Sequence, residues 1–456
     1  TASQYNVAVG HLTMDAAMAG ASNNAACGYA SLSSLTTGNQ NVGLGTAAGN
    51  AITTGDDNVC IGYRAGDAFD AENNNIFIGA NAGGGGSLAV GSTIGIGSSA
   101  LTALTSGGYN LAIGHQAGLL VTDGSSNTLI GYGVADGMRS NSSRNTALGA
   151  GAFGGTHATA DSDDCVAIGA YTMNQACNAV TGTVAVGSYA LNELTTGQRN
   201  LAIGYKALQD MDTGSDNTAI GYHSMLDAAN AGFDNNVAIG NYTMDEAVDV
   251  AASSNVAVGY SAMSGVLTAA ADDNVAVGSN ALLALTSGAN NTCIGSGSGD
   301  ALAAANDCVA VGYSSLSAIA TQAGTVSIGS GSLINLSSGV GNTCVGYQTG
   351  TGLTSGARNT VVGYQAMGDV DANDTPNSAD NVFIGFTAGG GTWSTNESNK
   401  NVGIGSYSMS AVMNNSVENN ALGYKALQAI TSGSYNVAVG TSAANAITGG
   451  NNNVAL

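Results

Sequence analysis

The sequence predicts an all-β fold, a parallel β-solenoid or β-roll of about 25 rungs with short helical turns and a left-handed coil. Three observations predict it. A five-residue block such as NVAVG at residues 6–10 recurs in 25 copies, closing on glycines from Gly10 to Gly440. The commonest interval between these glycines is 17 residues, which gives a period of 17–18. The chain also holds 69 Gly but only 1 Pro in 456 residues, and its 44% hydrophobic content is too high for disorder.

Each block is expected to form a short strand. Its first position is Asn in 20 of the 25 copies, the second is mostly Val or Thr, the third is small, and the fourth is Ile, Val or Leu. Alternation of this kind places the second and fourth side chains on one face of a strand and the third on the other. We expect the second and fourth columns to fill the interior. A small third column would then pack against the chain's own turns or against a neighbouring chain, which favours a homotrimer.

The repeated asparagine is expected to form an amide ladder, in which each side chain bonds to the turn of the next rung. A simpler interpretation is that Asn tolerates a left-handed backbone at the strand entry. The structural ladder is assigned to Asn6, Asn41, Asn58, Asn75, Asn110, Asn217, Asn236, Asn255, Asn274 and Asn436.

The dozen residues between blocks carry apolar residues three, four and seven positions after the glycine, a spacing that suggests one helical turn. A turn that contains Gly follows.

Because the repeat covers the chain, residues 1–456 are interpreted as one continuous solenoid. The rungs at 149–169, 363–385 and 385–405 are longer than the rest. Insertions in solenoids form loops that often bind ligands, so candidate ligand-binding residues are Trp393, Asn396, Asp371 and Asp374. Trp393 could stack on a sugar or could instead cover the core.

The repeat resembles known families. Residues 217–222 read NTAIGY and residues 200–208 read NLAIGYKAL. These motifs resemble the Ala/Gly/Asn-rich repeats of phage tail-fibre and surface-fibre proteins. They also resemble the left-handed β-roll heads of trimeric autotransporter adhesins. The resemblance implies an extracellular fibre on a virion or a bacterial surface, built from identical chains.

Charge and cysteine content limit the functional classes. The net charge of −22 and only 8 Lys and Arg exclude nucleic acid as a partner, and no apolar run is long enough for membrane insertion. No cofactor is expected, although acids in stacked turns are weak Ca²⁺ candidates. Seven cysteines lack a C-x-x-C motif, and a bridge between Cys165 and Cys177 is one possibility. The Ca²⁺ candidates are Asp56, Asp57, Asp163, Asp164, Asp272 and Asp273.

No arrangement of residues predicts catalysis. The four histidines are scattered through the chain and none is placed beside a nucleophile. The sequence therefore predicts a non-enzymatic structural rod of an extracellular attachment fibre, either a phage tail fibre or a bacterial adhesin. Two alternatives are a filament subunit that stacks end to end and a spike that binds a cell-surface polysaccharide.

Overall fold

The structure is a computed structural model of the whole chain. It divides into two compact units, Thr1–Ala231 and Gly232–Leu456. The residues that the structure describes are 2–84, 91–138, 141–156, 160–228, 233–246, 252–267, 271–318, 323–368, 377–391, 393 and 397–456.

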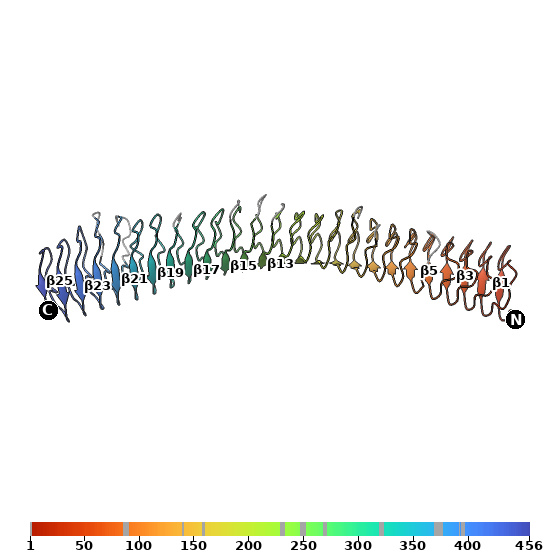
Figure 1. Cartoon of the computed structure of the whole chain (residues 1–456), viewed down its shortest axis with the longest axis horizontal. Helices are drawn as coiled ribbons and strands as arrows, with labels where there is room; N and C mark the ends of the chain where they lie inside the picture. The colour runs from red at the N-terminus through yellow and green to blue at the C-terminus, as the bar shows by residue number, and fades with distance from the viewer. Residues whose placement is uncertain are drawn as a thin grey trace. The chain divides into compact units, whose positions relative to one another are not determined.

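The first unit contains thirteen short strands that stack in chain order (Figure 1). Neighbouring strands are parallel and in register, so that Leu201, Ala202 and Ile203 pair with Thr218, Ala219 and Ile220. The strands are β1 (Val7–Val9), β2 (Ala25–Cys27), β3 (Val42–Leu44), β4 (Val59–Ile61), β5 (Ile76–Ile78), β6 (Ile94–Ile96), β7 (Leu111–Ile113), β8 (Thr128–Ile130), β9 (Thr146–Leu148), β10 (Val166–Ile168), β11 (Val184–Val186), β12 (Leu201–Ile203) and β13 (Thr218–Ile220).

The second unit repeats this plan with thirteen further strands, again parallel and in register. The predicted parallel β-solenoid is thereby confirmed. Its strands are β14 (Val237–Ile239), β15 (Val256–Val258), β16 (Val275–Val277), β17 (Thr292–Ile294), β18 (Val309–Val311), β19 (Val326–Ile328), β20 (Thr343–Val345), β21 (Thr360–Val362), β22 (Val382–Ile384), β23 (Val402–Ile404), β24 (Asn420–Leu422), β25 (Val437–Val439) and β26 (Val454–Ala455).

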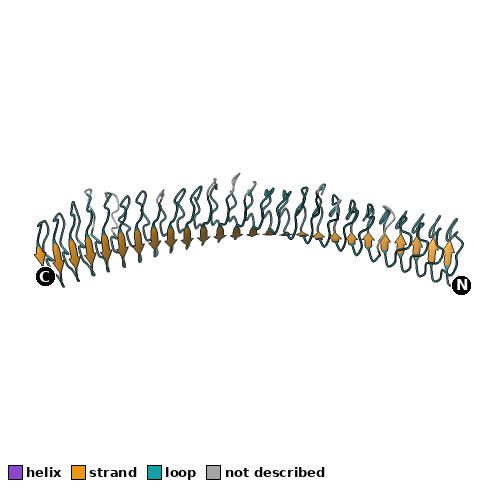
Figure 2. Cartoon of the chain, viewed as in Figure 1, coloured by secondary structure: helices purple, strands orange, loops and turns teal. Residues whose placement is uncertain are grey.

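The predicted short helical turns are wrong. Within the described residues each rung has its strand on one side and turns on the other, with no helix (Figure 2). The backbone φ angle is positive at alternate positions, as at Lys206 (59°) and Leu208 (51°), and a right-handed helical turn needs negative φ throughout. The N–H of Lys206 instead donates to Ser188 O in the preceding rung, and that of Leu208 to Ser224 O in the next. The apolar spacing that suggested a helix arises from this alternation.

The repeated glycine closes each strand because no other residue fits there. Gly114 has φ +141°, and a Cβ atom at this position would lie 2.1 Å from Gly131 O in the next rung. Both the backbone conformation and the close approach of the neighbouring rung exclude a side chain. The glycine column is therefore a direct consequence of stacking.

The expected inside and outside of the strands are reversed. The small third column faces the interior: Ala202 is fully buried, as are Leu208 and Met211 of the same rung. The second and fourth columns face outward and are half-buried or exposed. The interior is too narrow for two large columns: a Cβ on Gly43 would lie 2.8 Å from Leu32 Cγ. The third column is small because the turns of its own chain pack against it.

Glycines compensate for the few large residues in the third column. Phe383 is fully buried, and Cβ atoms on Gly389 and Gly403 would lie 2.8 and 2.7 Å from its Cδ1. Phe77 is accommodated in the same way, by Gly83 and Gly95. The core therefore conserves volume between adjacent rungs, as close packing requires.

Candidate functional site

In each unit, the strands present two columns of side chains on their outer side. The second and fourth columns of the strands form this surface, which we call the outward face. Each strand contributes two side chains that alternate with a buried third-column residue, so the face repeats with the strand spacing of about 4.8 Å. The members with the largest exposed fractions are Val7, Val9, Leu44, Ile130, Ile203, Ile239, Ile294, Ile328, Ile384, Leu422, Val437, Val439 and Val454.

No charged residue occurs in the outward face across the 26 strands. Its members are Val, Ile and Leu, with Thr in six strands and single polar or small substitutions such as Asn420 and Cys27. The 30 acidic residues that produce the net charge of −22 all lie outside these strands. The face is therefore apolar on an otherwise acidic chain.

An aromatic row follows the closing glycines, beyond the end of the strands. The rings stack along the direction in which the rungs repeat: Tyr347 and Tyr364 have centroids 5.1 Å apart, and Tyr364 and Phe386 5.4 Å. Within such a stack, neighbouring rings cover one another's faces. The row comprises Tyr29, Tyr63, Tyr132, Tyr205, Tyr222, Tyr260, Tyr313, Tyr347, Tyr364, Phe386 and Tyr424, all of them exposed.

An inner ladder of asparagine amides runs along the strand entries. Asn41 Oδ1 accepts bonds from the N–H and Nδ2 of Asn58, at 3.0 Å each, and Asn41 Nδ2 donates to Gly55 O at 2.8 Å. These amides are buried, so the bonds satisfy groups that water does not reach. The ladder bonds include Asn6, Asn41, Asn58, Asn75, Asn110, Asn217, Asn236, Asn255, Asn274 and Asn436.

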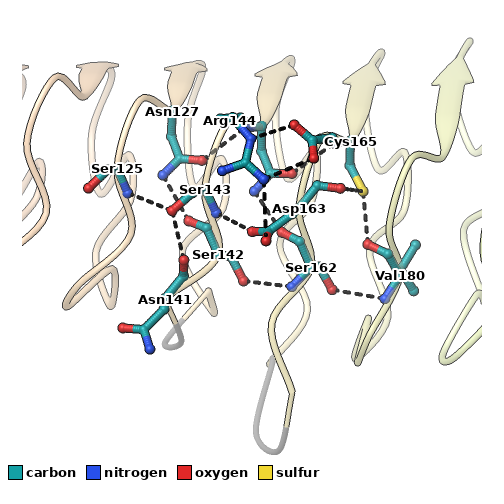
Figure 3. Close-up of polar contacts among 12 residues, drawn as sticks. Ser125, Asn127, Asn141, Ser142, Ser143, Arg144, Ser162, Asp163, Cys165 and Val180 are labelled. Carbon is teal, nitrogen blue, oxygen red and sulfur yellow. Dashed lines mark hydrogen bonds and ion pairs between the residues drawn. The ribbon is translucent and has the colours of Figure 1, made fainter.

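An outer ladder lies two residues before the inner one and runs in the opposite direction (Figure 3). Here the backbone N–H of one rung donates to a side chain of the next: Ser125 N to Ser143 Oγ at 3.0 Å, and Ser143 N to Asp163 Oδ1 at 2.7 Å. Sequence reasoning missed this ladder. Its column mixes Ser, Asn and Asp, which are all short acceptors but do not form a single-letter repeat.

Three of the calcium candidates belong to the outer ladder. Asp56, Asp163 and Asp272 accept backbone N–H bonds at 2.6, 2.7 and 2.8 Å. Their neighbours are exposed: Asp164 pairs with Arg144 at 2.6 Å, which lowers the pKa of that carboxyl, and Asp57 and Asp273 occupy left-handed turn positions. Among the described residues, no group of three or more His, Cys, Asp or Glu is placed to hold a metal ion.

Of the residues expected to bind a ligand on the long rungs, Trp393 lies in the described part of the chain. Trp393 is buried; its Nε1 donates to Gly389 O at 2.8 Å, and its ring packs edge-on against Phe383. The indole covers the core and offers no face to a sugar. Asn396, Asp371 and Asp374 lie outside the described residues.

None of the seven cysteines forms a disulfide. Cys165 and Cys177 form no bridge; their sulfurs donate to the carbonyl oxygens of Val180 and Leu194. Burial raises the pKa of the Cys165 thiol to about 11. Cys27 differs, because it lies in the outward face and is exposed.

An acidic depression is lined by Gln175, Glu193, Thr195, Asp210 and Asp212. Burial, a hydrogen bond from Asp227 and the charge of Glu193 raise the pKa of Asp210 to about 6. No histidine is among these lining residues; His11 and His115 stack on Tyr29 and Tyr132 of the aromatic row. The depression therefore holds a carboxyl whose pKa is raised well above its ordinary value.

No protein-family model matches the sequence, and no curated protein is significantly similar to it. The described residues include no helix long and apolar enough to span a membrane.

Proposed function

We propose that the chain is a non-enzymatic structural rod of an extracellular attachment fibre, of a phage tail or a bacterial surface, and that it assembles as a homotrimer through the outward face. The observation that carries the proposal is the uncharged apolar face on both units. The extracellular setting rests on the resemblance of the NTAIGY-type repeats to fibre and adhesin proteins.

The area of the outward face favours burial in an assembly. Thirteen strands spaced about 4.8 Å apart, with columns about 7 Å apart, give a strip of about 440 Å² on each unit. That lies within the range of the largest apolar patch of a typical monomer, about 300–600 Å². The strips of the two units add up to about 870 Å², and a standard interface buries about 800 Å² per partner.

The charge distribution favours a second copy of the same chain as the occupant. Two chains of net charge −22 repel each other wherever their acids approach. The outward face holds no acid, so it is the surface on which copies meet with the least repulsion. Identical rung spacing also lets the columns of each copy match along the face.

Sedimentation equilibrium tests the proposal. We expect a particle of three times the chain mass of 44.4 kDa. The variant Leu44→Lys/Ile203→Lys places two charges in the outward face and should dissociate the particle, since burying unpaired charges is costly. The matched control, Thr37→Lys/Thr196→Lys, adds the same charges at exposed turn positions of the same unit and should stay trimeric.

A wild-type monomer would overturn assembly through the outward face. A dimer would retain that contact but overturn the three-fold arrangement. Particles of indefinite length would instead support the end-to-end filament.

A further inference from the structure

In the first unit, one rung without an aromatic ring lies between two stacked pairs of rings. His115 stacks on Tyr132 at 5.4 Å, and Tyr171 stacks on Tyr189 at 5.4 Å. The rung between these two pairs has Ala150 and Gly151 in the positions that carry rings in its neighbours. Each pair therefore ends on a ring with no ring from that rung beside it.

A depression of about 340 Å³ lies at this rung, and both Tyr132 and Tyr171 line it. A Cβ on Gly151 would lie 3.0 Å from Tyr171 Cδ1, so the ring of Tyr171 lies across that glycine. Two glycines thus keep the space open: a side chain at Gly151 would meet the ring, and one at Gly154 would lie 2.6 Å from Asn174 Oδ1.

Polar side chains complete the depression. A Cβ on Gly154 would lie 3.3 Å from Asp136 Oδ1 as well as near Asn174, so the carboxylate and the amide lie on either side of this glycine. Asp136 lines the depression, and burial raises the pKa of its carboxyl. The site combines aromatic faces with hydrogen-bonding groups of both kinds.

We propose that this slot, between Tyr132 and Tyr171 and beside Asp136 and Asn174, binds one hexopyranose unit of a glycan. A pyranose has an apolar C–H face that packs on an aromatic ring, and hydroxyls around its edge that donate to a carboxylate and bond to an amide. A phenylalanine side chain would fit between the rings, but its edge would give Asp136 no donor.

The inference rests on the proposed attachment function and names a ligand class for it. None of the lining residues belongs to the outward face. The sheet faces of the copies can therefore pack together without using the slot residues.

Saturation-transfer NMR and calorimetry on the full chain test the slot, with galactose, glucose, mannose and N-acetylglucosamine as probes. We expect at least one of them to bind. The variant Ala150→Tyr fills the slot with the residue commonest in the aromatic row, at a position with ordinary negative φ, and should weaken binding at least tenfold while the fold is retained. Asn174→Ala should weaken it several-fold, through loss of one hydrogen-bonding group.

The matched control is Ser279→Tyr, which adds a ring at the equivalent position of the second unit and should leave binding unchanged. Failure of all four sugars to bind would overturn the proposal, as would equal binding by wild type and Ala150→Tyr. Binding of N-acetyltyrosinamide alone, lost in Ala150→Tyr, would replace the sugar with an aromatic side chain. None of these outcomes affects the sedimentation mass, so failure here is separate from failure of the fibre assembly.

Discussion

Asn41 Oδ1 lies 3.0 Å from both the backbone nitrogen and Nδ2 of Asn58, and accepts a hydrogen bond from each. Asn58 in turn donates to Glu72 O at 2.8 Å and accepts from the N–H of Asn75 at 3.0 Å. One side chain therefore links three successive rungs in a buried position. Its removal leaves buried groups on both neighbours without partners.

Asn58→Ala is expected to destabilise the surrounding rungs by about 2–4 kcal/mol, since each orphaned buried group costs about 1–3 kcal/mol. Hydrogen exchange of the amides in β3, β4 and β5 measures the loss locally, which suits a repeat protein that opens by segments. The control is Asn39→Ala in the outer ladder, where water replaces the lost bond and the cost should be below about 1 kcal/mol. Equal losses in the two variants would contradict a special role for the inner ladder.

Volume compensation between Phe383 and Gly403 predicts a coupled pair. Gly403 has ordinary φ, so Ala is allowed by the backbone, but its Cβ would lie 2.7 Å from Phe383 Cδ1. Gly403→Ala should cost about 1–3 kcal/mol by overpacking, and Phe383→Ala about 3–5 kcal/mol by leaving a cavity. The double variant should lose less than the sum, as measured by chemical denaturation. Additive losses would show that the two residues do not share the same space.

The fold could be predicted from sequence because each strand block carries its own alternation and its own closing glycine. The direction of the faces could not. A block such as VAV at residues 7–9 has the same alternation whichever side faces the interior, and hydrophobicity alone favours the larger residues for the core. Which face points inward is decided by the turn residues on the opposite side of the rung. Leu32 lies so close to Gly43 that a small third column is required.

The candidate sites were harder to predict for a related reason. Trp393 stands out by its rarity, yet its environment depends on Phe383, ten residues earlier in the chain. The slot at Ala150 and Gly151 has no signal of its own. These two residues acquire meaning only because the structure places Tyr132 and Tyr171, from the rungs before and after, in the same depression.

The raised pKa of Asp210 predicts a pH dependence of stability. Its pKa is about 6 in the folded chain and 3.8 as the reference value, so the folded state binds the proton more readily than the unfolded state. Stability from this group therefore rises as the pH falls from about 7 to 4 and is lost as the pH rises through 6. Pairing with arginine lowers the pKa values of Asp216 and Asp380. The stability that these two carboxyls contribute is therefore lost only when the pH falls through their lowered pKa values.

Thermal unfolding of wild type and Asp210→Asn at pH 7 and pH 5 measures this effect. At pH 7 the melting temperature of the variant should exceed that of wild type by up to a few degrees. The difference in melting temperature should be smaller at pH 5. Asp212→Asn serves as the control, since Asp212 lines the same depression. A difference between wild type and Asp210→Asn that is the same at both pH values would show that Asp210 does not titrate in this range.

Cys27 provides an internal test of the homotrimer. It is the exposed thiol of the outward face, where it pairs laterally with Val9 and Leu44 of the adjacent strands. In a parallel three-fold assembly, the three copies of Cys27 lie at the same height and face a common axis. Mild oxidation with copper phenanthroline, which accepts the two electrons, should then join two chains by a disulfide and leave the third free. Denaturing electrophoresis without reductant would show a crosslinked dimer in wild type but none in Cys27→Ser.

Cys60, fully buried in the third column of β4, should not crosslink. A face-to-face antiparallel pair would separate the two Cys27 residues and give no crosslink, so a negative result in a particle of trimeric mass would exclude the parallel arrangement.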